Sequence, residues 1–363
     1  MEKKLRIGII GTGGIAKGHL TSYMRMPDVE IIGASDIVPG KARAFLDTYG
    51  LNDVPAFENN DELLALKPDG ISVCTYNTTH HICACAAMNA GAHVLCEKPM
   101  SVTLDQAVEM ARTQKATGKI LTIGFQPRYD ENMKLVKDVV QSGELGHIYY
   151  IQTGGGRRRG IPGRSFIKKD EAGVGCLADI GCYGLDMALN AVGYRKPVTV
   201  SAYASDYFGT NPKYYANAAE FNVDDFTCAL IRFEDGLVID FRMSWAMHMD
   251  TMGDTLFLGT DAGLKVKSPH PDKNWGGAWD GSIGGLYLYK DVCGKQVEMK
   301  IPINDTEKSG NFFKKCRAFC DAIKTNGPSP IPWQEIIYNQ AIIDGIIRSS
   351  QLRREVEVVI PEI

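Results

Sequence analysis

The sequence LRIGIIGTGGIA, residues 5–16, determines the fold class of this protein. Its apolar half, Leu5–Ile10, predicts a buried β-strand that runs straight into a glycine-rich turn of the form G-x-G-x-x-A. In such a turn Gly11 permits the tight bend, Gly13 lets the backbone approach a pyrophosphate, and Ala16 allows close packing of helix on strand. The N-terminus of the following helix offers free N–H groups to the phosphates. The residues of this predicted dinucleotide site are Gly11, Thr12, Gly13, Gly14 and Ile15.

Asp36 supports the same interpretation. It follows the second predicted strand, Val29–Ala34, about 20 residues after the glycine turn, where a carboxylate accepts hydrogen bonds from the adenosine ribose. A carboxylate there would repel a 2′-phosphate, and the next residues, Ile37 and Val38, provide no arginine to hold one. The sequence therefore favours NAD over NADP. The alternative is that Asp36 is only a loop carboxylate or a helix cap.

The first 125 residues alternate short apolar strands with helical patterns, which predicts a parallel sheet with crossover helices. The expected strands are Leu5–Ile10, Val29–Ala34, Ile71–Thr75, His93–Cys96 and Ile120–Gly124, and the clearest helix is Leu104–Ala116. The expected fold class is α/β, with a Rossmann dinucleotide-binding domain over residues 1–125.

The remainder, residues 126–363, carries longer strands rich in aromatic and β-branched residues. We expect an α+β domain built on a large, open, mostly antiparallel sheet, which binds substrate and forms oligomer contacts. Its expected strands are Ile148–Thr153, Thr199–Ala204, Phe226–Phe233, Leu237–Trp245, Leu286–Tyr289, Val297–Ile301 and Val356–Ile360. Its expected helices are Glu131–Gln141, Asp179–Ala191, Gly310–Lys324 and Trp333–Ser350.

Composition excludes several classes of protein. Of the 363 residues, 44% are hydrophobic and 23% charged, a balance typical of soluble globular proteins. The net charge of −3 gives no basic field for nucleic acid or an anionic membrane. The N-terminal segment does not resemble a signal peptide, and no apolar run approaches the length of a membrane span. We therefore expect a cytoplasmic protein with neither a nucleic-acid nor a membrane partner.

Ten cysteines are scattered through the predicted strands and helices, and none forms a C-x-x-C pair. In a cytosolic chain such residues are expected to be reduced, buried thiols. The alternative is a metal cluster formed by His80, His81, Cys83 and Cys85. These side chains could share only part of one helix face and would need a further ligand from elsewhere, so no metal is predicted.

Four motifs in this order resemble the glucose–fructose oxidoreductase / inositol dehydrogenase / rhizopine catabolism family. Cys96–Pro99 (CEKP) carries its Glu-Lys-Pro, and Thr75–His80 (TYNTTH) resembles T-P-N-x-x-H with Tyr76 in place of proline. Gly124–Tyr129 (GFQPRY) resembles the segment that crosses between its domains, and Gly173–Tyr183 (GVGCLADIGCY) resembles G-G-G-x-L-x-D-I-G-x-H. The resemblance covers nearly the whole chain.

The resemblance implies the site. Most members have histidine where this chain has Tyr183, which is closer to the branch of glucose–fructose oxidoreductase and dimeric dihydrodiol dehydrogenase than to myo-inositol dehydrogenases. The implied catalytic residues are Lys98, Asp179 and Tyr183. Implied cofactor contacts, beyond the glycine turn and Asp36, are Thr75, Asn77, His80, Glu97, Lys98 and Gln126. Implied substrate contacts are Lys98, Arg128, Arg158, Asp179 and Tyr183.

These residue types suit alcohol oxidation, in which a hydride leaves to NAD and a proton must be accepted. Free tyrosine has a pKa near ~10, and a nearby ammonium such as that of Lys98 favours the phenolate. Asp179 lies one helical turn before Tyr183 and would orient Lys98 or bind a substrate hydroxyl. Each residue also has a structural interpretation: Lys98 as a strand-end lysine, Tyr183 as a core aromatic, and Asp179 as a helix N-cap.

Arg157–Arg159, with Arg164 shortly after, follows a predicted strand that faces the nicotinamide in this family. Arginines there could bind an anionic or heavily hydroxylated ligand, although a solvated basic loop explains them equally well. His248 is a further candidate of the same kind, with an ordinary buried or surface histidine as the alternative.

We expect an NAD-dependent dehydrogenase acting on a secondary hydroxyl of a sugar, cyclitol or glycoside, possibly giving a 3-keto sugar. The alternatives are redox-neutral glycoside cleavage with retained NAD, a trans-1,2-diol or xylose dehydrogenase, and a catalytically silent NAD-binding sensor. Strands between Phe226 and Trp245 show no all-polar face, so one sheet face is expected to pack against a partner subunit in a dimer or tetramer.

Overall fold

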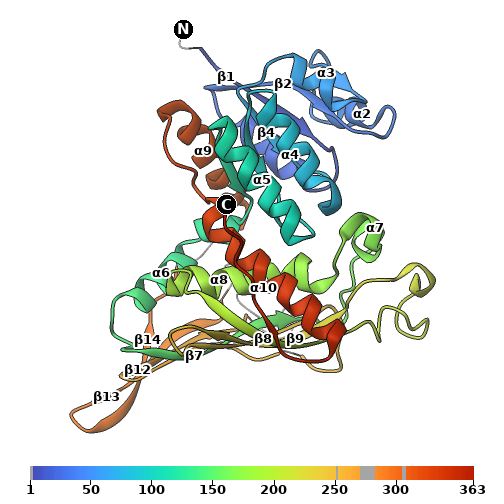
Figure 1. Ribbon diagram of the computed structural model, residues 1–363. Coiled ribbons are helices and arrows are strands. Elements are labelled where there is room, and N and C mark those ends of the chain that lie inside the picture. The colour runs from blue at the N-terminus through green and yellow to red at the C-terminus, as the bar shows by residue number, and fades with distance from the viewer. Residues whose placement is uncertain (1–2, 251, 270–282, 305–307) are drawn as a thin grey trace. The chain divides into compact units, whose positions relative to one another are not determined.

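The computed structural model describes residues 3–250, 252–269, 283–304 and 308–363 (Figure 1). The chain forms two compact units. Unit 1 contains Met1–Gln126, Ser309–Ile336 and Pro361–Ile363, and unit 2 contains Pro127–Lys308 and Ile337–Ile360. The chain first passes from unit 1 to unit 2 after Gln126, next to the predicted domain boundary at residue 125. The predicted second domain is not contiguous, however, because the chain returns to unit 1 after residue 308.

Unit 1 is built on a six-stranded parallel sheet in the order β3-β2-β1-β4-β5-β6, as expected for a dinucleotide-binding domain. Its strands are β1 (Leu5–Ile10), β2 (Val29–Ser35), β3 (Ala56–Phe57), β4 (Gly70–Val73), β5 (His93–Cys96) and β6 (Leu121–Ile123). Its helices are α1 (Ala16–Met24), α2 (Lys41–Thr48), α3 (Asn60–Ala65), α4 (His80–Asn89), α5 (Leu104–Thr117) and most of α9 (Lys308–Thr325).

Helix α9 returns to unit 1 because of its apolar face. Cys316, Phe319 and Cys320 are fully buried in a cluster that also contains Ile7 of β1 and Tyr23 of α1. Burying such a face gains roughly 25 cal/mol per Å² of apolar surface. The expected helix Gly310–Lys324 is therefore confirmed, but it completes the cofactor domain.

Unit 2 contains a nine-stranded sheet in the order β14-β13-β12-β11-β7-β10-β9-β8-β15, in which only β7 and β10 pair in parallel. The mostly antiparallel sheet is thus confirmed. Its strands are β7 (Ile148–Gly156), β8 (Pro197–Ser205), β9 (Phe226–Phe233), β10 (Val238–Ser244), β11 (Thr255–Gly259), β12 (Ala262–Lys267), β13 (Gly285–Val292), β14 (Lys295–Ile301) and β15 (Val356–Glu357).

Helices cover one face of this sheet, where Figure 1 shows α8 and α10 together. On α10, Ser349 Oγ and Ser350 Oγ accept hydrogen bonds from the backbone N–H groups of Ala202 (2.9 Å) and Ala204 (3.0 Å) in β8. These serines satisfy strand donors that the short β15 does not reach. The unit's helices are α6 (Glu131–Gln141), α7 (Lys169–Ala172), α8 (Cys182–Val192) and the larger part of α10 (Trp333–Leu352).

Among the residues that the structure describes, one helical stretch, Lys169–Val192, is long and apolar enough by composition to span a membrane, with a mean hydropathy of 1.2 over 18 residues. The sequence analysis did not expect such a stretch. In its most apolar 18-residue window, 89% of the residues are buried inside the fold, as in a core helix.

All ten cysteines are free, and only Cys228 and Cys293 have more than slight exposure. In the described part of the chain, no three histidine, cysteine or acidic side chains come together as metal ligands. Within the cluster considered above, Cys83 Sγ instead lies 3.6 Å from Asn60 Nδ2.

Candidate active site

The glycine turn between β1 and α1 has the geometry of a phosphate-binding loop. Gly11 has φ +85°, and a Cβ atom there would lie 2.7 Å from the carbonyl oxygen of Cys74. A side chain is therefore excluded by both conformation and space. At Gly13 and Gly14 a Cβ would meet nothing within 4 Å, so their backbone is open to an approaching group. Helix α1 begins immediately afterwards, with Ile15 as its N-cap residue. This arrangement fits a pyrophosphate.

Asp36, at the end of β2, is tied to this loop. Its Oδ2 accepts hydrogen bonds from the N–H (2.9 Å) and hydroxyl (2.8 Å) of Thr12, and its Oδ1 accepts one from Val38 N–H (3.1 Å). Burial by itself would raise the pKa of Asp36, but the bonds from Lys41, Thr12 and Val38 outweigh it and lower the pKa. The carboxylate is therefore ionised and held where a ribose would lie.

Lys41 is a neighbour of Asp36 that the sequence analysis missed. Its Nζ lies 2.9 Å from Asp36 Oδ2 and keeps partial exposure. Ile37 and Val38 provide no cation, yet the turn into α2 brings Lys41 back to the carboxylate. The sequence feature that could have indicated this contact is the position of Lys41 as the first residue of α2. Lys41 reduces the negative field that Asp36 presents.

Lys98 follows β5 and is half-buried, between two firmly anchored neighbours. On one side, Glu97 is 3% exposed and forms an ion pair with Lys315 of α9, which is itself 1% exposed. Glu97 Oε1 also accepts a 2.7 Å hydrogen bond from His19 Nε2. The predicted cofactor contact through Glu97 thus receives no support from its carboxylate, which is engaged inside the domain.

His19 continues this buried network. Since its Nε2–H donates to Glu97, the neutral ring accepts at Nδ1, which lies 3.1 Å from Ser72 Oγ. The Tyr23 hydroxyl lies 2.7 Å from the same Ser72 oxygen. Burial and the charge of Lys315 lower the pKa of His19 despite the contact with Glu97, so the ring is neutral. Burial would raise the pKa of Glu97, but Lys315 and His19 lower it further than burial raises it.

On the other side of Lys98, His80 holds Pro99. Its Nδ1 donates a 2.7 Å hydrogen bond to the Pro99 carbonyl, and the ring is 1% exposed. Burial lowers the pKa of His80, so it too is neutral. The TYNTTH turn therefore supports the Glu-Lys-Pro loop through its last residue. Thr75 and Asn77 precede His80 at the carboxyl end of β4, and both are partly exposed. Gln126 opens the 3-10 turn Gln126–Tyr129 after β6. Their cofactor contacts remain predictions.

In unit 2, Tyr183 lies in the first turn of α8 and Asp179 lies in the turn just before it. The residues before α8, Leu177–Gly181, form a π-helical turn, a feature frequent at functional sites. Asp179 is 8% exposed and accepts a 3.1 Å hydrogen bond from Trp245 Nε1, and Tyr183 is 5% exposed. Asp179 lies inside this helical segment, so the alternative interpretation as its N-cap is wrong.

The start of this helical segment is capped by Asp224, which the sequence analysis missed. Its two carboxylate oxygens accept hydrogen bonds from Gly175 N–H (2.7 Å) and Leu177 N–H (2.8 Å). A Cβ on Gly175 would lie 1.9 Å from the Asp224 carbonyl oxygen, so this glycine of the GVGCLADIG motif is required for close approach. No sequence signal links residues 47 positions apart.

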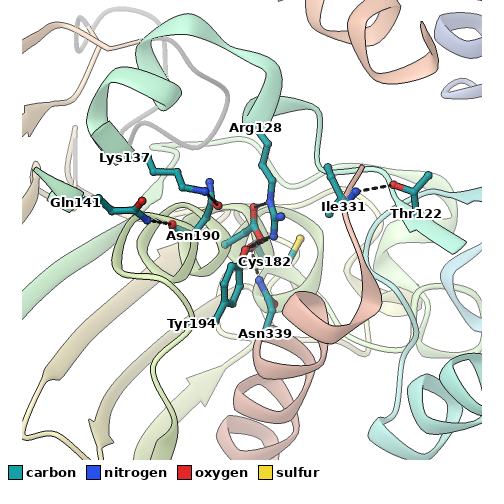
Figure 2. A network of polar contacts seen from close by, with 10 residues as sticks. Thr122, Arg128, Lys137, Gln141, Cys182, Asn190, Tyr194, Ile331 and Asn339 are labelled. Atoms are coloured by element: carbon teal, nitrogen blue, oxygen red, sulfur yellow. Dashed lines mark hydrogen bonds and ion pairs between the residues drawn. The ribbon is translucent and has the colours of Figure 1, made fainter. Parts of the chain in front are cut away.

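The arginine of the GFQPRY segment has structural partners (Figure 2). Arg128 Nε donates to Asp186 Oδ2 (2.9 Å) and its Nη2 to Asp186 Oδ1 (2.6 Å), while its guanidinium carbon lies 5.4 Å from the centroid of the Tyr194 ring. Nearby, Asn339 Nδ2 donates to the Cys182 carbonyl (2.9 Å), which ties α10 to α8. A substrate contact by Arg128 stays a prediction and would have to coexist with this ion pair.

The three consecutive arginines diverge after β7. Arg158 is exposed, and the structure gives no support to its predicted substrate contact. Arg157 lies partly buried near Asp179, whose charge raises its pKa, although burial lowers that pKa more. Arg159 turns toward His248, with Nη2 3.0 Å from Nδ1. Arg157 thus lies within electrostatic reach of a predicted catalytic residue, which sequence spacing alone could not indicate.

Comparison with known proteins agrees with these two halves. Residues 5–125 match an oxidoreductase family with an NAD-binding Rossmann fold, and residues 133–265 match the GFO/IDH/MocA C-terminal domain. D-glucoside 3-dehydrogenase of Escherichia coli (strain K12) is 32% identical over 274 residues, which cover 73% of this chain and 78% of that protein.

Two further similarities are less extensive or more distant. Glucose-6-phosphate 3-dehydrogenase of Bacillus subtilis (strain 168) is 33% identical over 50% of this chain and 52% of its own length. The solved structure of levoglucosan dehydrogenase in complex with NADH has a TM-score of 0.82 at 20% identity and covers 99% of this chain and 100% of that one. At that identity it shows the fold alone.

Proposed function

Since this chain belongs to the GFO/IDH/MocA family of NAD-binding oxidoreductases, we propose that it oxidises a secondary hydroxyl of a sugar, cyclitol or glycoside. The observation that carries the proposal is Lys98, held at the end of β5 between two buried anchors, Glu97 and Pro99. Such anchoring fixes the backbone around the ammonium, as precise positioning of a catalytic group requires.

The residues divide the chemistry among them. NAD, when bound, supplies the hydride acceptor, and the glycine turn and Asp36 hold its pyrophosphate and ribose. Lys98 donates a hydrogen bond to the reacting oxygen and favours its ionised form. Tyr183 accepts or returns the proton. Asp179, oriented by the Trp245 N–H, binds a substrate hydroxyl.

For the substrate we propose a pyranose or glycoside oxidised at the third carbon. The E. coli relative is named a D-glucoside 3-dehydrogenase and the B. subtilis relative a glucose-6-phosphate 3-dehydrogenase. The tyrosine at position 183 supports a pyranose more than myo-inositol, which the sequence resemblance already disfavoured.

We further propose a cytoplasmic homo-oligomer, a dimer or tetramer. The face of the nine-stranded sheet away from its buried residues presents Leu230 (37% exposed) and Tyr203 (59% exposed), and Tyr203 lies opposite Cys228 in the register of β8 and β9. Such a surface is suited to packing against the same surface of a second copy. Light scattering at micromolar concentration tests this, and a monomer would contradict it.

The decisive experiment is a screen of the purified protein with NAD against sugars, cyclitols and glycosides, read as NADH absorbance. A ring-oxidising dehydrogenase should produce stoichiometric NADH with a subset of pyranosides. Cleavage of a glycoside without net NADH would identify the redox-neutral alternative. NADH production only from xylose or a trans-1,2-diol would identify the alternative of a xylose or trans-1,2-diol dehydrogenase. Binding of NAD without turnover of any compound would favour the alternative of a catalytically silent NAD-binding sensor.

A further inference from the structure

An aromatic cluster lies in unit 2 outside the catalytic residues discussed above. It consists of Tyr207, Phe208, Tyr214 and His248. The Phe208 ring centroid lies 4.9 Å from that of Tyr214, 5.4 Å from that of Tyr207 and 5.2 Å from that of His248. Tyr207 is also 6.2 Å from Tyr214, and His248 is 5.7 Å from Tyr214. These separations are typical of tilted and edge-to-face aromatic packing.

Arg159 holds this cluster in place. Its guanidinium carbon lies 4.8 Å from the Phe208 centroid and 5.4 Å from that of Tyr214. Its Nη1 donates to the Met247 carbonyl (2.6 Å), and its Nη2 lies 3.0 Å from His248 Nδ1. A guanidinium only donates, so Nδ1 accepts and the neutral ring carries its proton on Nε2. The exposed His248 therefore presents an N–H donor beside the rings.

The cluster is linked along the chain to Trp245, which contacts Asp179. The parallel strands β7 and β10 end together, and beyond them Arg157 N–H donates to the Ser244 carbonyl at 2.9 Å. Arg159 then forms a β-bridge with Ala246. Between these contacts lies Trp245, whose indole N–H donates to Asp179. The backbone that supports Asp179 thus leads within three residues to His248.

One ring of the cluster remains open. Tyr207 is 59% exposed although Phe208 and Tyr214 brace it, so its ring is held without being covered. A braced aromatic ring loses little conformational entropy when a flat ligand stacks on it. The apolar C–H face of a sugar ring or the face of an aryl group fits such a surface, and a hydroxyl of the same ligand can accept from His248 Nε2–H.

We propose that Tyr207, Phe208, Tyr214 and His248 form a subsite for the ring attached to the anomeric oxygen of a glycoside substrate. The identity of the reacting ring rests on the function proposed above. A free monosaccharide would be held by the residues around Asp179 and would leave this surface unused. Arg159 and Lys213, whose Nζ lies 5.2 Å from the Tyr214 centroid, make the surface positive, so the second ring is neutral or anionic.

Kinetics with the holoenzyme and NAD test the subsite. The substrates are methyl glucoside, 4-nitrophenyl glucoside and a glucosyl disaccharide, each in both anomeric forms. Tyr207→Ala should raise KM about fivefold for at least one of the two-ring substrates and less than twofold for methyl glucoside, because stacking on one ring contributes about 1 kcal/mol. Which two-ring substrate is affected tells whether the second ring is an aryl group or a sugar.

Tyr149→Ala is the matched control. Tyr149 is also exposed (47%) but lies at the opposite end of β7 from Arg157, roughly 20–25 Å along the strand. It should leave all three KM values unchanged. Tyr207→Leu keeps apolar volume without a flat face, so it should resemble Tyr207→Ala. Equal KM changes for one-ring and two-ring substrates, or none, would overturn the subsite while leaving the dehydrogenase proposal intact.

Calorimetric titration of the NAD-loaded protein with 4-nitrophenyl glucoside and with the disaccharide gives a readout that needs no turnover. Loss of binding in Tyr207→Ala but not in Tyr149→Ala supports the subsite even if no substrate reduces NAD, in which case only the proposed function fails. Unchanged affinity of Tyr207→Ala for both ligands would overturn the subsite.

Discussion

The two segments that carry the predicted catalytic residues are held in place by different physics. In unit 1, the Lys98 loop is anchored by a buried ion pair, Glu97 with Lys315, made across 218 residues of sequence. In unit 2, the helical segment of Asp179 and Tyr183 is anchored by Asp224, whose carboxylate accepts the backbone N–H groups of Gly175 and Leu177. The Glu97–Lys315 ion pair stabilises its loop only while both charges are present. The Asp224 carboxylate accepts two separate N–H groups, so one of its hydrogen bonds can be lost while the other remains.

This difference indicates which variants should lower the catalytic rate and which should lower the stability of the fold. Removing one partner of a buried ion pair leaves a charge without compensation, which costs about 3–5 kcal/mol. Removing a cap costs about 0.5–2 kcal/mol. Replacing the catalytic group between the anchors should cost rate and little stability.

The largest expected effect is on rate. Lys98→Ala should lower kcat by about 10²-fold or more, because a proton-handling group typically supplies 10²–10⁴-fold, while NAD affinity and the melting temperature stay near their original values.

Tyr183→Phe should lower kcat by a comparable factor, and Tyr183→His should retain activity with a pH profile shifted toward histidine titration. Steady-state kinetics and fluorescence titration of NAD measure this. A small loss in Tyr183→Phe would assign Tyr183 to packing.

The next effect is on stability. Lys315→Met should lower the free energy of unfolding by about 3–5 kcal/mol, because Glu97 then keeps only His19 as a buried partner. Lys314→Met, at an exposed neighbouring position, is the control and should change it by less than about 0.5 kcal/mol. Adding Glu97→Gln to Lys315→Met should recover part of the loss. Urea unfolding measures all three, and equal values for Lys315→Met and Lys314→Met would contradict the anchoring role.

Asp36 in unit 1 and Asp224 in unit 2 both accept backbone N–H groups, but only Asp36 is expected to meet a ligand. NAD should bind at least tenfold more tightly than NADP, because a 2′-phosphate would face the Asp36 carboxylate. Asp36→Ala should weaken NAD binding and reduce the difference between the affinities for NAD and NADP. Lys41→Ala should widen it, because it removes the cation paired with Asp36. Titration of both cofactors measures the ratio, and equal affinities in the unmodified protein would refute the expectation.

Asp224→Ala should lower the free energy of unfolding by about 1–2 kcal/mol, less than Lys315→Met, because it removes the acceptor for Gly175 and Leu177 N–H groups. Asp224→Asn keeps one carbonyl acceptor and should lose about half as much. Thermal and urea unfolding of the two variants check the order. A loss from Asp224→Ala as large as that from Lys315→Met would remove the contrast between the anchors.

The last expected effect is a pH dependence in unit 2. Burial, with the nearby charges of Asp206 and Asp224, raises the pKa of Asp225 from 3.8 to about 6, although Gly209 N–H (2.6 Å) donates to it. A raised acid pKa stabilises the fold fully below pH 3.8, and this contribution is lost as pH rises through 6. Asp225→Asn should therefore lose less stability than the unmodified protein between pH 4 and pH 6. Parallel slopes of unfolding free energy against pH would speak against it.

The fold-forming motifs contiguous in sequence were predicted correctly because their chemistry is local, whereas the cofactor and substrate contacts assigned from the other motifs stay predictions. The strand–glycine turn–helix of residues 5–24, the parallel sheet and the mostly antiparallel second sheet follow from apolar periodicity and from glycine at a positive φ, both readable along the chain. Membership of an NAD-binding oxidoreductase family follows from the same motifs. What a strand or a turn needs is supplied by its own few residues.

Only the tertiary structure decided the partners. Lys315 reaches Glu97 because α9 folds back on unit 1, Asp224 caps a helix 47 positions earlier, and Lys41 returns to Asp36 through a turn. It also directed Arg157 and Arg159, two residues apart on the chain, toward Asp179 and His248 respectively. Such contacts depend on which surfaces the fold brings together. A buried charge or N–H takes whichever partner the packing supplies, and sequence spacing does not record that choice.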